Sequence, residues 1–353
     1  MAAKYPPKQL NNEMSRAELS TPDEYTPEPL VKIENLSKLF PLTTGLFKKA
    51  TSFIHAVDGI SVNIQAGESL GLVGESGSGK TTTGKLLVRL HEPTDGQIRM
   101  VLDGEDKDIV NLRGRDSKFF HRHSQMIFQD PYESLNPRRT IFDTIAEPLV
   151  VQGIGSVTER EERVSEHLDT VGLSPPETFV FRYPHELSGG QRQRVAIARA
   201  LIVLPTFVVA DEPTSMLDVS IRTGIMNLML ELADDMGVTY LYITHDLAVA
   251  RYMTQRLGVM YLGKIVEMGE TEEILANPLH PYTKALLSAV PVPDPTWSRK
   301  QPDIIGSIAK AIDPIPRCRF YSRCPIATKV CEDNDHPPLE EKAPDHWAAC
   351  YLV

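Results

Sequence analysis

The sequence lacks long hydrophobic runs, an excess of basic residues and, over its first 317 positions, any cysteine. Its longest apolar run, Leu201 to Ala210, is interrupted by Pro205 and Thr206. A membrane-spanning helix needs about 20 apolar residues, so we expect none here. The net charge of −10 argues against a nucleic-acid-binding surface, which carries a basic stripe. No cationic stretch followed by an apolar one opens the chain, so we expect no export signal and a cytoplasmic protein.

The composition is that of a soluble globular protein, with 41% hydrophobic and 24% charged residues among 353. This length accommodates one large domain and a smaller one. Residues 1–29 are rich in Pro, Glu, Ser and Asn without apolar periodicity, which predicts a disordered tail. Proline punctuates residues 277–295, so we expect a main domain over 30–270 and a C-terminal domain over 271–353.

Short apolar or β-branched runs predict the strands of the main domain. The runs at 207–210 and 238–244 are flanked by helical patterns, which indicates buried parallel strands in an α/β fold. Alternating or short apolar patterns predict further strands at 31–36, 60–64, 97–102 and 125–128. Residues 133–185 are mostly helical in pattern, and no internal repeat is present.

Residues 74–81 read Gly-Glu-Ser-Gly-Ser-Gly-Lys-Thr and follow the apolar run 69–73. This is the pattern G-x-x-x-x-G-K-[ST], a glycine-rich turn between a buried strand and a helix. The glycines allow successive backbone N–H groups to point at one anion. Lys80 can reach the β- and γ-phosphates, and the Thr81 hydroxyl can bind Mg²⁺. The loop predicts binding of a nucleoside triphosphate.

Two carboxylates, Asp211 and Glu212, end the apolar strand candidate at 207–210. In a protein with a phosphate-binding loop, such an acid holds Mg²⁺, and its neighbour can act on the attacking water. The plainer interpretation is an ordinary strand end with solvated acids.

The sequence Leu187-Ser188-Gly189-Gly190-Gln191 precedes a strongly helical run that begins at Arg192. Bare amides at a helix N-terminus form an anion site, because unpaired N–H groups and the helix dipole both favour negative charge. Taken alone, Ser-Gly-Gly is more typical of a flexible turn.

These motifs occur in one order: the loop 74–81, Gln129, 187–191, Asp211-Glu212, Asp218 and His245. Over residues 31 to about 270 the chain resembles ATP-binding cassette (ABC) ATPases. The resemblance implies an α/β P-loop fold with a parallel-sheet core, an antiparallel β subdomain and a helical subdomain at about 131–187.

The resemblance also implies roles for individual residues. It makes Glu212 the catalytic base, His245 the switch residue at the γ-phosphate and Gln129 the sensor of Mg²⁺ and attacking water. Mg²⁺ would be held by Thr81, Gln129 and Asp211. The residues of the ATP site would be Phe40, Gly74, Glu75, Ser76, Gly77, Ser78, Gly79, Lys80, Thr81, Thr82, Gln129 and Asp211. Ser188, Gly189, Gly190, Gln191 and Asp218 would act on ATP held by a second cassette.

Two of these assignments compete with core roles. Phe40, expected to stack on adenine, can instead be a strand-end core residue, because the segment Pro41 to Phe53 looks like an insertion. A histidine after a strand, like His245, is ordinarily a satisfied core residue.

The C-terminal part resembles the oligopeptide and dipeptide importer branch of the family. It contains His280-Pro281-Tyr282-Thr283-Lys284 and a proline-rich stretch at 290–293. The resemblance implies the second ATPase of such a system, working at the cytoplasmic face of the inner membrane as a peripheral subunit. Its partners would be a related ATPase in a heterodimer, two transmembrane permeases and an extracytoplasmic peptide-binding protein, with no nucleic acid.

All four cysteines, Cys318, Cys324, Cys331 and Cys350, lie in the last 36 residues. In a reducing cytosol, such a cluster is more typical of metal ligands than of disulfides. Four thiolates suit Zn²⁺ or an iron–sulfur cluster, and the closely spaced pairs usual for structural zinc are missing. The importer branch implies a [4Fe-4S] cluster, with Zn²⁺ or no metal as the alternatives.

Two other kinds of cassette protein are alternatives for the whole chain. Soluble cassettes of DNA repair or translation carry two fused cassettes or a long coiled coil, and iron–sulfur assembly cassettes lack the His-Pro-Tyr element. The sequence does not identify the cargo among dipeptides, longer peptides, glutathione, nickel chelates and sugars.

Overall fold

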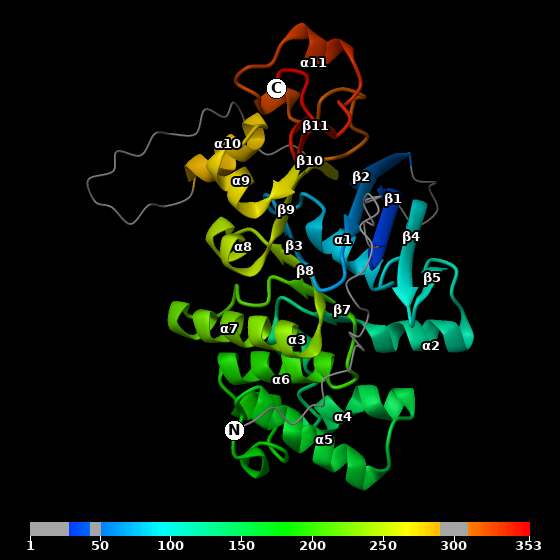
Figure 1. Ribbon diagram of the computed structural model, residues 1–353, viewed down its shortest axis with the longest axis vertical. Helices are drawn as coiled ribbons and strands as arrows, with labels where there is room; N and C mark the ends of the chain where they lie inside the picture. Colours follow the sequence, from blue (N-terminus) through cyan, green and yellow to red (C-terminus); the bar gives the residue numbers. More distant parts are fainter. Residues whose placement is uncertain (1–27, 43–50, 290–309) are drawn as a thin grey trace, which may run out of the picture.

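The computed structural model describes residues 28–42, 51–289 and 310–353, and two β-sheets form its framework (Figure 1). The expected N-terminal tail (1–29) lies almost wholly outside the described residues, as does the proline-rich stretch 290–293. A helical block lies at one end of the molecule and the C-terminal region at the other, with the sheets between them.

The larger sheet has eight strands in the order β11-β12-β10-β9-β3-β8-β7-β6. Its centre is parallel, with β3 paired to β8 and β9, and β7 paired to β6 and β8. The strands of this parallel part are buried along most of their length, as expected for a sheet covered on both faces. They are β3 (Ser69–Val73), β6 (Ser124–Ile127), β7 (Phe207–Asp211), β8 (Thr239–Thr244) and β9 (Arg256–Tyr261).

Three antiparallel strands extend the larger sheet beyond β9. They are β10 (Lys264–Glu270), β12 (His346–Ala348) and β11 (Glu340–Ala343). The C-terminal region, expected as a domain of its own, therefore shares a sheet with the main domain. It also contains a single-turn helix at Tyr321–Arg323 and α11 (Lys329–Asp333).

The smaller sheet is antiparallel, with the order β2-β1-β4-β5. Its strands are β1 (Val31–Leu42), β2 (Ser52–Ile64), β4 (Asp95–Leu102) and β5 (Glu105–Asp108). Pro41 of β1 pairs with Phe53 of β2. The first and last residues of the expected insertion, 41–53, therefore belong to strands. The ladder is longer than the alternating pattern at 31–36 and 60–64 predicted.

The helical block consists of α3 (Pro131–Ser134), α4 (Ile141–Gln152), α5 (Val157–Thr170) and α6 (Gly189–Leu201), with single turns at Pro176–Thr178 and Pro184–Glu186. Local sequence sets these boundaries. The Thr140 hydroxyl caps α4, which ends at Gly153 in the left-handed conformation, and Ser156 forms a capping box with Glu159.

The other helices pack around the sheets. They are α1 (Lys80–Leu87), α2 (Gly114–His123), α7 (Val219–Met236), α8 (Leu247–Met253), α9 (Thr271–Ala276) and α10 (Pro281–Ala289). No helix among the described residues is long and apolar enough to cross a membrane.

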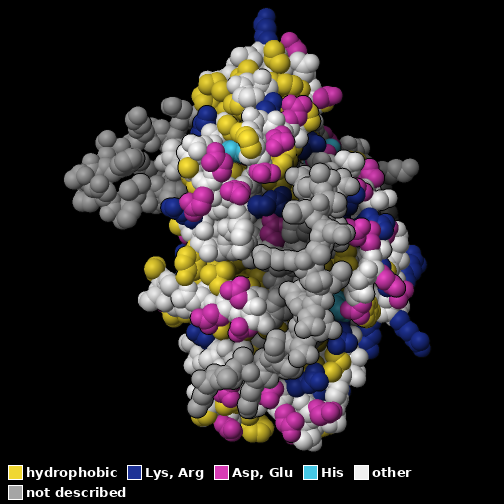
Figure 2. All heavy atoms as spheres, in the orientation of Figure 1, with side chains coloured by type: hydrophobic (Ala, Val, Ile, Leu, Met, Phe, Trp, Pro, Cys, Tyr) yellow, Lys and Arg dark blue, Asp and Glu magenta, His cyan; other side chains and the backbone are white. Residues whose placement is uncertain are grey.

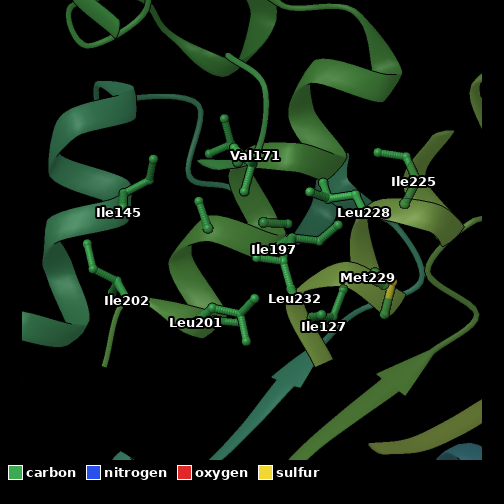
Figure 3. Packing of buried hydrophobic residues seen from close by; sticks show 14 of the residues in the cluster. Ile127, Ile145, Val171, Ile197, Leu201, Ile202, Ile225, Leu228, Met229 and Leu232 are labelled. Carbon is green, nitrogen blue, oxygen red and sulfur yellow. The ribbon is translucent and has the colours of Figure 1, made fainter. Parts of the chain in front are cut away.

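One hydrophobic core joins the helical block to the sheet (Figure 3). It runs from Ile127 at the end of β6, through Ile197 and Leu201 of α6, to Leu228 and Leu232 of α7. Each such side chain stabilises the fold by about 1.5–3 kcal/mol when fully buried. The block is thereby packed against the part of the larger sheet formed by β6, β7 and β8.

Hydrophobic side chains are also visible on the outer surface of the C-terminal region, at the top of Figure 2. Within the C-terminal region, Ile315, Ile326 and Val330 are exposed, whereas Phe320 and Cys331 are buried. Phe320 and Cys331 belong to a hydrophobic cluster that the C-terminal region shares with β3, β9, β10 and the helices α8, α9 and α10.

Candidate active site

The loop 74–79 turns directly out of β3 into α1, and its shape depends on glycine. Gly74 has φ 150° and Gly79 has φ 113°. A Cβ at Gly74 would lie 2.1 Å from the carbonyl oxygen of Met260, and one at Gly79 would lie 2.1 Å from that of Ala56. No side chain fits at either position, so β9 and β2 hold the loop in place from both sides.

Lys80, the first residue of α1, folds back over this loop. Its ammonium group donates to the carbonyl oxygens of Gly74 (2.8 Å) and Glu75 (3.0 Å), and the residue is 6% exposed. Burial lowers the pKa of Lys80, partly offset by the carboxylates of Glu212, Asp211 and Glu75. Lys80 therefore supplies a partly desolvated cation at the centre of an anion-binding loop.

The next residue, Thr81, meets the end of β7. Its hydroxyl donates to Asp211 Oδ1 at 3.0 Å. Asp211 is 3% exposed, and burial, with repulsion from Glu212, raises the pKa of its carboxyl. A hydroxyl and a carboxylate are the hard oxygen donors that Mg²⁺ prefers, so the two residues fit a magnesium ion that also contacts a phosphate.

Glu212 receives contacts from two further loops. Gln129 Nε2 donates to Glu212 Oε2 at 3.0 Å, and His245 Nδ1 lies 2.9 Å from Glu212 Oε1. The Glu212 backbone has φ 46° and its N–H donates to the carbonyl of Ile243 on β8. Gln129 and His245, which are far apart along the chain, therefore both contact the Glu212 carboxylate beside the phosphate-binding loop.

Lys80, Thr81, Gln129, Glu212 and His245 line one cavity of about 1080 Å³, whereas Asp211 does not line it. Its walls include Phe40 at the far end of β1, whose ring meets His91 edge-on at 5.5 Å. The loop and the first turn of α1 contribute Gly74, Glu75, Ser76, Gly77, Gly79, Lys80, Thr81 and Thr82. Ser78 is 3% exposed behind the loop, where its backbone oxygen accepts from the N–H of Gly263.

The sequence did not point to a further wall of this cavity, formed by Leu286 and residues 310–312. The carbonyl of Ala311 accepts from the N–H of His55, and Ile312 bridges Ile54 of β2. No local pattern indicates this wall, because it arises from pairing between residues far apart in the chain.

The Ser-Gly-Gly-Gln motif does not line this cavity. It begins α6, where Ser188 Oγ accepts from the N–H of Gln191 and Gln191 Oε1 accepts from the N–H of Ser188. Asp218 likewise lies apart, directly before α7. A single chain therefore brings the phosphate-binding loop 74–79 together with Asp211, Glu212, Gln129 and His245. Residues 188–191 and Asp218 of the same chain lie outside this site.

The four cysteines are free thiols gathered in the C-terminal region. The N–H of Cys318 donates to the carbonyl of Cys331, and the N–H of Leu352 contacts Cys350 Sγ at 3.4 Å. Burial raises the pKa of Cys318 to about 11, and the other three cysteines add to the rise. Among the described residues, no three His, Cys, Asp or Glu side chains are close enough together to hold a metal ion.

Two family models match the chain. The ABC transporter model matches residues 57–215, and the model of the oligopeptide/dipeptide transporter C-terminal region matches residues 266–331. The ABC transporter match spans the phosphate-binding loop and the Asp211-Glu212 pair. The C-terminal match includes Leu286, which lines the cavity, and three of the four cysteines.

Similar proteins cover almost the whole chain. The oligopeptide transport ATP-binding protein AppF of Bacillus subtilis is 45% identical over 328 residues, which are 92% of this chain and 98% of that protein. OppF of the same organism is 50% identical, covering 92% of this chain and 96% of its own length.

Among solved structures, the ATP-binding cassette MJ0796, a dimer in a post-hydrolysis state bound to ADP and Pi, is similar with a TM-score of 0.59. It is 32% identical and covers 68% of this chain and 98% of its own length.

Proposed function

Because this chain belongs to the ABC transporter family and is therefore an ATPase that works on ATP with Mg²⁺, we propose that it powers a peptide importer. The observation that carries the proposal is the convergence of Lys80, the Thr81–Asp211 pair and Glu212 at the end of one parallel sheet. The C-terminal region with its own transporter match supports the importer branch.

We assign the residues of the cavity to the steps of ATP hydrolysis. The loop 74–79 and Lys80 bind the β- and γ-phosphates, and Thr82 completes this site at the start of α1. Phe40 stacks on the adenine. Thr81, Asp211 and Gln129 would hold Mg²⁺, which neutralises developing charge on the phosphates.

Glu212 accepts a proton from the attacking water as the water oxygen bonds to the γ-phosphorus, while the bond from the γ-phosphorus to its bridging oxygen breaks and ADP leaves. Gln129 and His245 hold the Glu212 carboxylate in place from two sides, and His245 then contacts the γ-phosphate. General-base catalysis of this kind accelerates a reaction by about 10²–10⁴-fold.

The motif 188–191 and Asp218 act on the ATP of a second cassette. Their place outside the cavity supports this, because they do not line the site for the nucleotide of their own chain. Two residues close to Asp218 are exposed: Met216 is 59% and Val219 is 77% exposed. Such exposure is expected for a surface that makes its contact only in the dimer. Hydrolysis removes the bridging γ-phosphate, and the dimer opens.

The second cassette is a related ATPase, so the working unit is a heterodimer. It docks on two transmembrane permeases at the cytoplasmic face of the inner membrane, and an extracytoplasmic binding protein delivers the peptide. The oligopeptide names of AppF and OppF support peptides as the cargo class.

We also propose that Cys318, Cys324, Cys331 and Cys350 hold a [4Fe-4S] cluster with a structural role. Zinc needs all its thiolates about 2.3 Å from one ion. A four-iron cluster attaches each thiolate to a different iron, so its ligands need not meet at one point. What supports the proposal is that all four cysteines are free thiols of the C-terminal region and that none forms a disulfide.

The decisive experiment compares wild type and Lys80→Ala in native membranes. Wild type captured by affinity should bring down two integral membrane proteins and a related ATPase, and should hydrolyse ATP. Lys80→Ala should capture the same partners but neither bind nor hydrolyse ATP. Capture without membrane proteins would reject the importer, and unchanged hydrolysis in Lys80→Ala would reject the site.

A further inference from the structure

We propose that Arg323 is a positioning residue for the phosphate-binding loop: from the C-terminal region, it fixes and neutralises Glu75 so that the loop is held ready for ATP. The inference rests on the assignment of residues 74–81 to the phosphates made above. It adds a residue of the C-terminal region, 248 positions away in the sequence, to the nucleotide site.

The contact is a two-pronged ion pair. Arg323 Nη1 donates to Glu75 Oε2 at 2.6 Å, and Nη2 donates to Glu75 Oε1 at 2.9 Å. Arg323 is 5% exposed, and the Glu75 side chain is 22% exposed. Parallel hydrogen bonds of this kind fix orientation as well as charge, because the planar guanidinium matches the carboxylate.

The backbone of Glu75 is held from the same side. Its N–H donates to the hydroxyl of Tyr282 on α10 at 2.8 Å. The rings of Tyr282, Tyr261 and Phe320 lie 4.6 to 5.5 Å apart and pack behind the ion pair. Both the side chain and the amide of one loop residue therefore depend on the C-terminal half of the chain.

The segment that carries Arg323 is itself anchored. Arg323 lies in the single turn Tyr321–Arg323, between Cys318 and Cys324. Four residues earlier, Arg319 pairs with Asp58 on β2, and Arg319 is also largely buried. Two buried arginines thus tie this short segment to β2 and to the phosphate-binding loop.

Glu75 is the only carboxylate of the loop 74–79, and Arg323 is the cation that balances its negative charge. Glu75 is one of the residues that line the cavity in which the phosphates would bind, and an unpaired negative charge there would repel them. Arg323 turns this charge away from the phosphates and cancels it. Its loss should therefore weaken ATP binding more than it slows the chemical step, since Glu212 and its partners are untouched.

The test measures ATP hydrolysis by the full chain in the reconstituted transporter. If the loop is competent in only a tenth of the molecules without Arg323, the apparent dissociation constant rises about tenfold. Arg323→Ala should therefore raise the KM for ATP about tenfold, with kcat within about twofold of wild type. Arg251→Ala is the matched control, because it breaks a similar two-pronged pair with Glu272 on the surface.

Two further variants separate position from charge and guard against misfolding. Arg323→Lys keeps the charge but not the fork, and Glu75→Gln removes the charge to be neutralised. Each should raise the KM less than Arg323→Ala, and Glu75→Gln combined with Arg323→Ala should recover part of the tenfold loss. If Arg323→Ala without nucleotide has a lower melting temperature but the wild-type KM for ATP, Arg323 only stabilises the fold, and the proposal is overturned.

The failure of this inference differs from the failure of the proposed function. If Lys80→Ala abolishes ATP binding while Arg323→Ala, Arg323→Lys and Glu75→Gln all keep the wild-type KM, only the role of Arg323 is rejected. If Lys80→Ala binds ATP normally, the assignment of the loop itself is wrong.

Discussion

Replacement of Glu212 by Gln tests the site at its centre. Glutamine has nearly the same shape, and its oxygen can still accept from Gln129 Nε2, which lies 3.0 Å from the carboxylate. The amide, however, cannot take a proton from water. We therefore expect ATP binding to persist in Glu212→Gln while hydrolysis nearly stops.

The magnitude follows from the lost base. General-base catalysis contributes about 10²–10⁴-fold to a rate. At 1.36 kcal/mol for each factor of ten, the barrier to hydrolysis should rise by about 2.7–5.4 kcal/mol. The dissociation constant of ATP should stay within about threefold of wild type, because neither Lys80 nor the Thr81–Asp211 contact is altered.

The assay is phosphate release by the reconstituted transporter, with ATP binding measured on the same preparation. Light scattering should also show that ATP holds Glu212→Gln as a closed dimer. Glu272→Gln, on the surface of α9, is the matched control and should behave as wild type. Phosphate release at the wild-type rate by Glu212→Gln would refute Glu212 as the base.

Three further outcomes can be checked. His280 is buried, and burial, with the nearby charges of His336 and Lys284, lowers its pKa from 6.5 to about 3. Only the unfolded chain takes up its proton between these values, so the contribution of His280 is complete above pH 6.5 and is lost as the pH falls. His280→Asn should therefore lose about 2 kcal/mol less stability than wild type between pH 7 and pH 5 in urea unfolding, and equal losses would contradict the buried neutral ring. Phe40→Ala should weaken ATP binding by about 1–3 kcal/mol but leave tripolyphosphate binding unchanged, since stacking involves only the base; equal weakening of both would exclude stacking. The protein purified without oxygen should be brown and bleached by dithionite, and Cys331→Ser should lose this colour; a colourless wild type with stoichiometric zinc would end the cluster proposal.

The sequence predicted those parts of the site that are contiguous in the chain. The loop 74–81 could be identified because its glycines, lysine and threonine sit at fixed spacing between an apolar strand and a helix. Asp211 and Glu212 could be placed beside it because parallel strands β3 and β7 end at the same edge of the sheet. The structure confirms the α/β fold, and Gln129 and His245 each contact the Glu212 carboxylate.

The remaining contacts could not be predicted, because they join segments far apart in the chain. The pattern at 31–36 and 60–64 showed two strands but not the length of their ladder. Arg323 looked like part of a cysteine-rich segment, and nothing local connects it to Glu75. The wall at 310–312 depends on a bridge to Ile54, which only the folded chain creates.

The pairing of β12 with β10 has a consequence for any shortened form of this protein. Glu267 of β10 is completely buried, with His346 Nε2 at 2.7 Å and the N–H groups of Leu279 and His280 as its other partners. Removing β11 and β12 would expose the edge of β10 to pairing with another chain. It would also leave the buried Glu267 without the imidazole of His346. A truncated cassette should therefore aggregate rather than survive as a minimal ATPase.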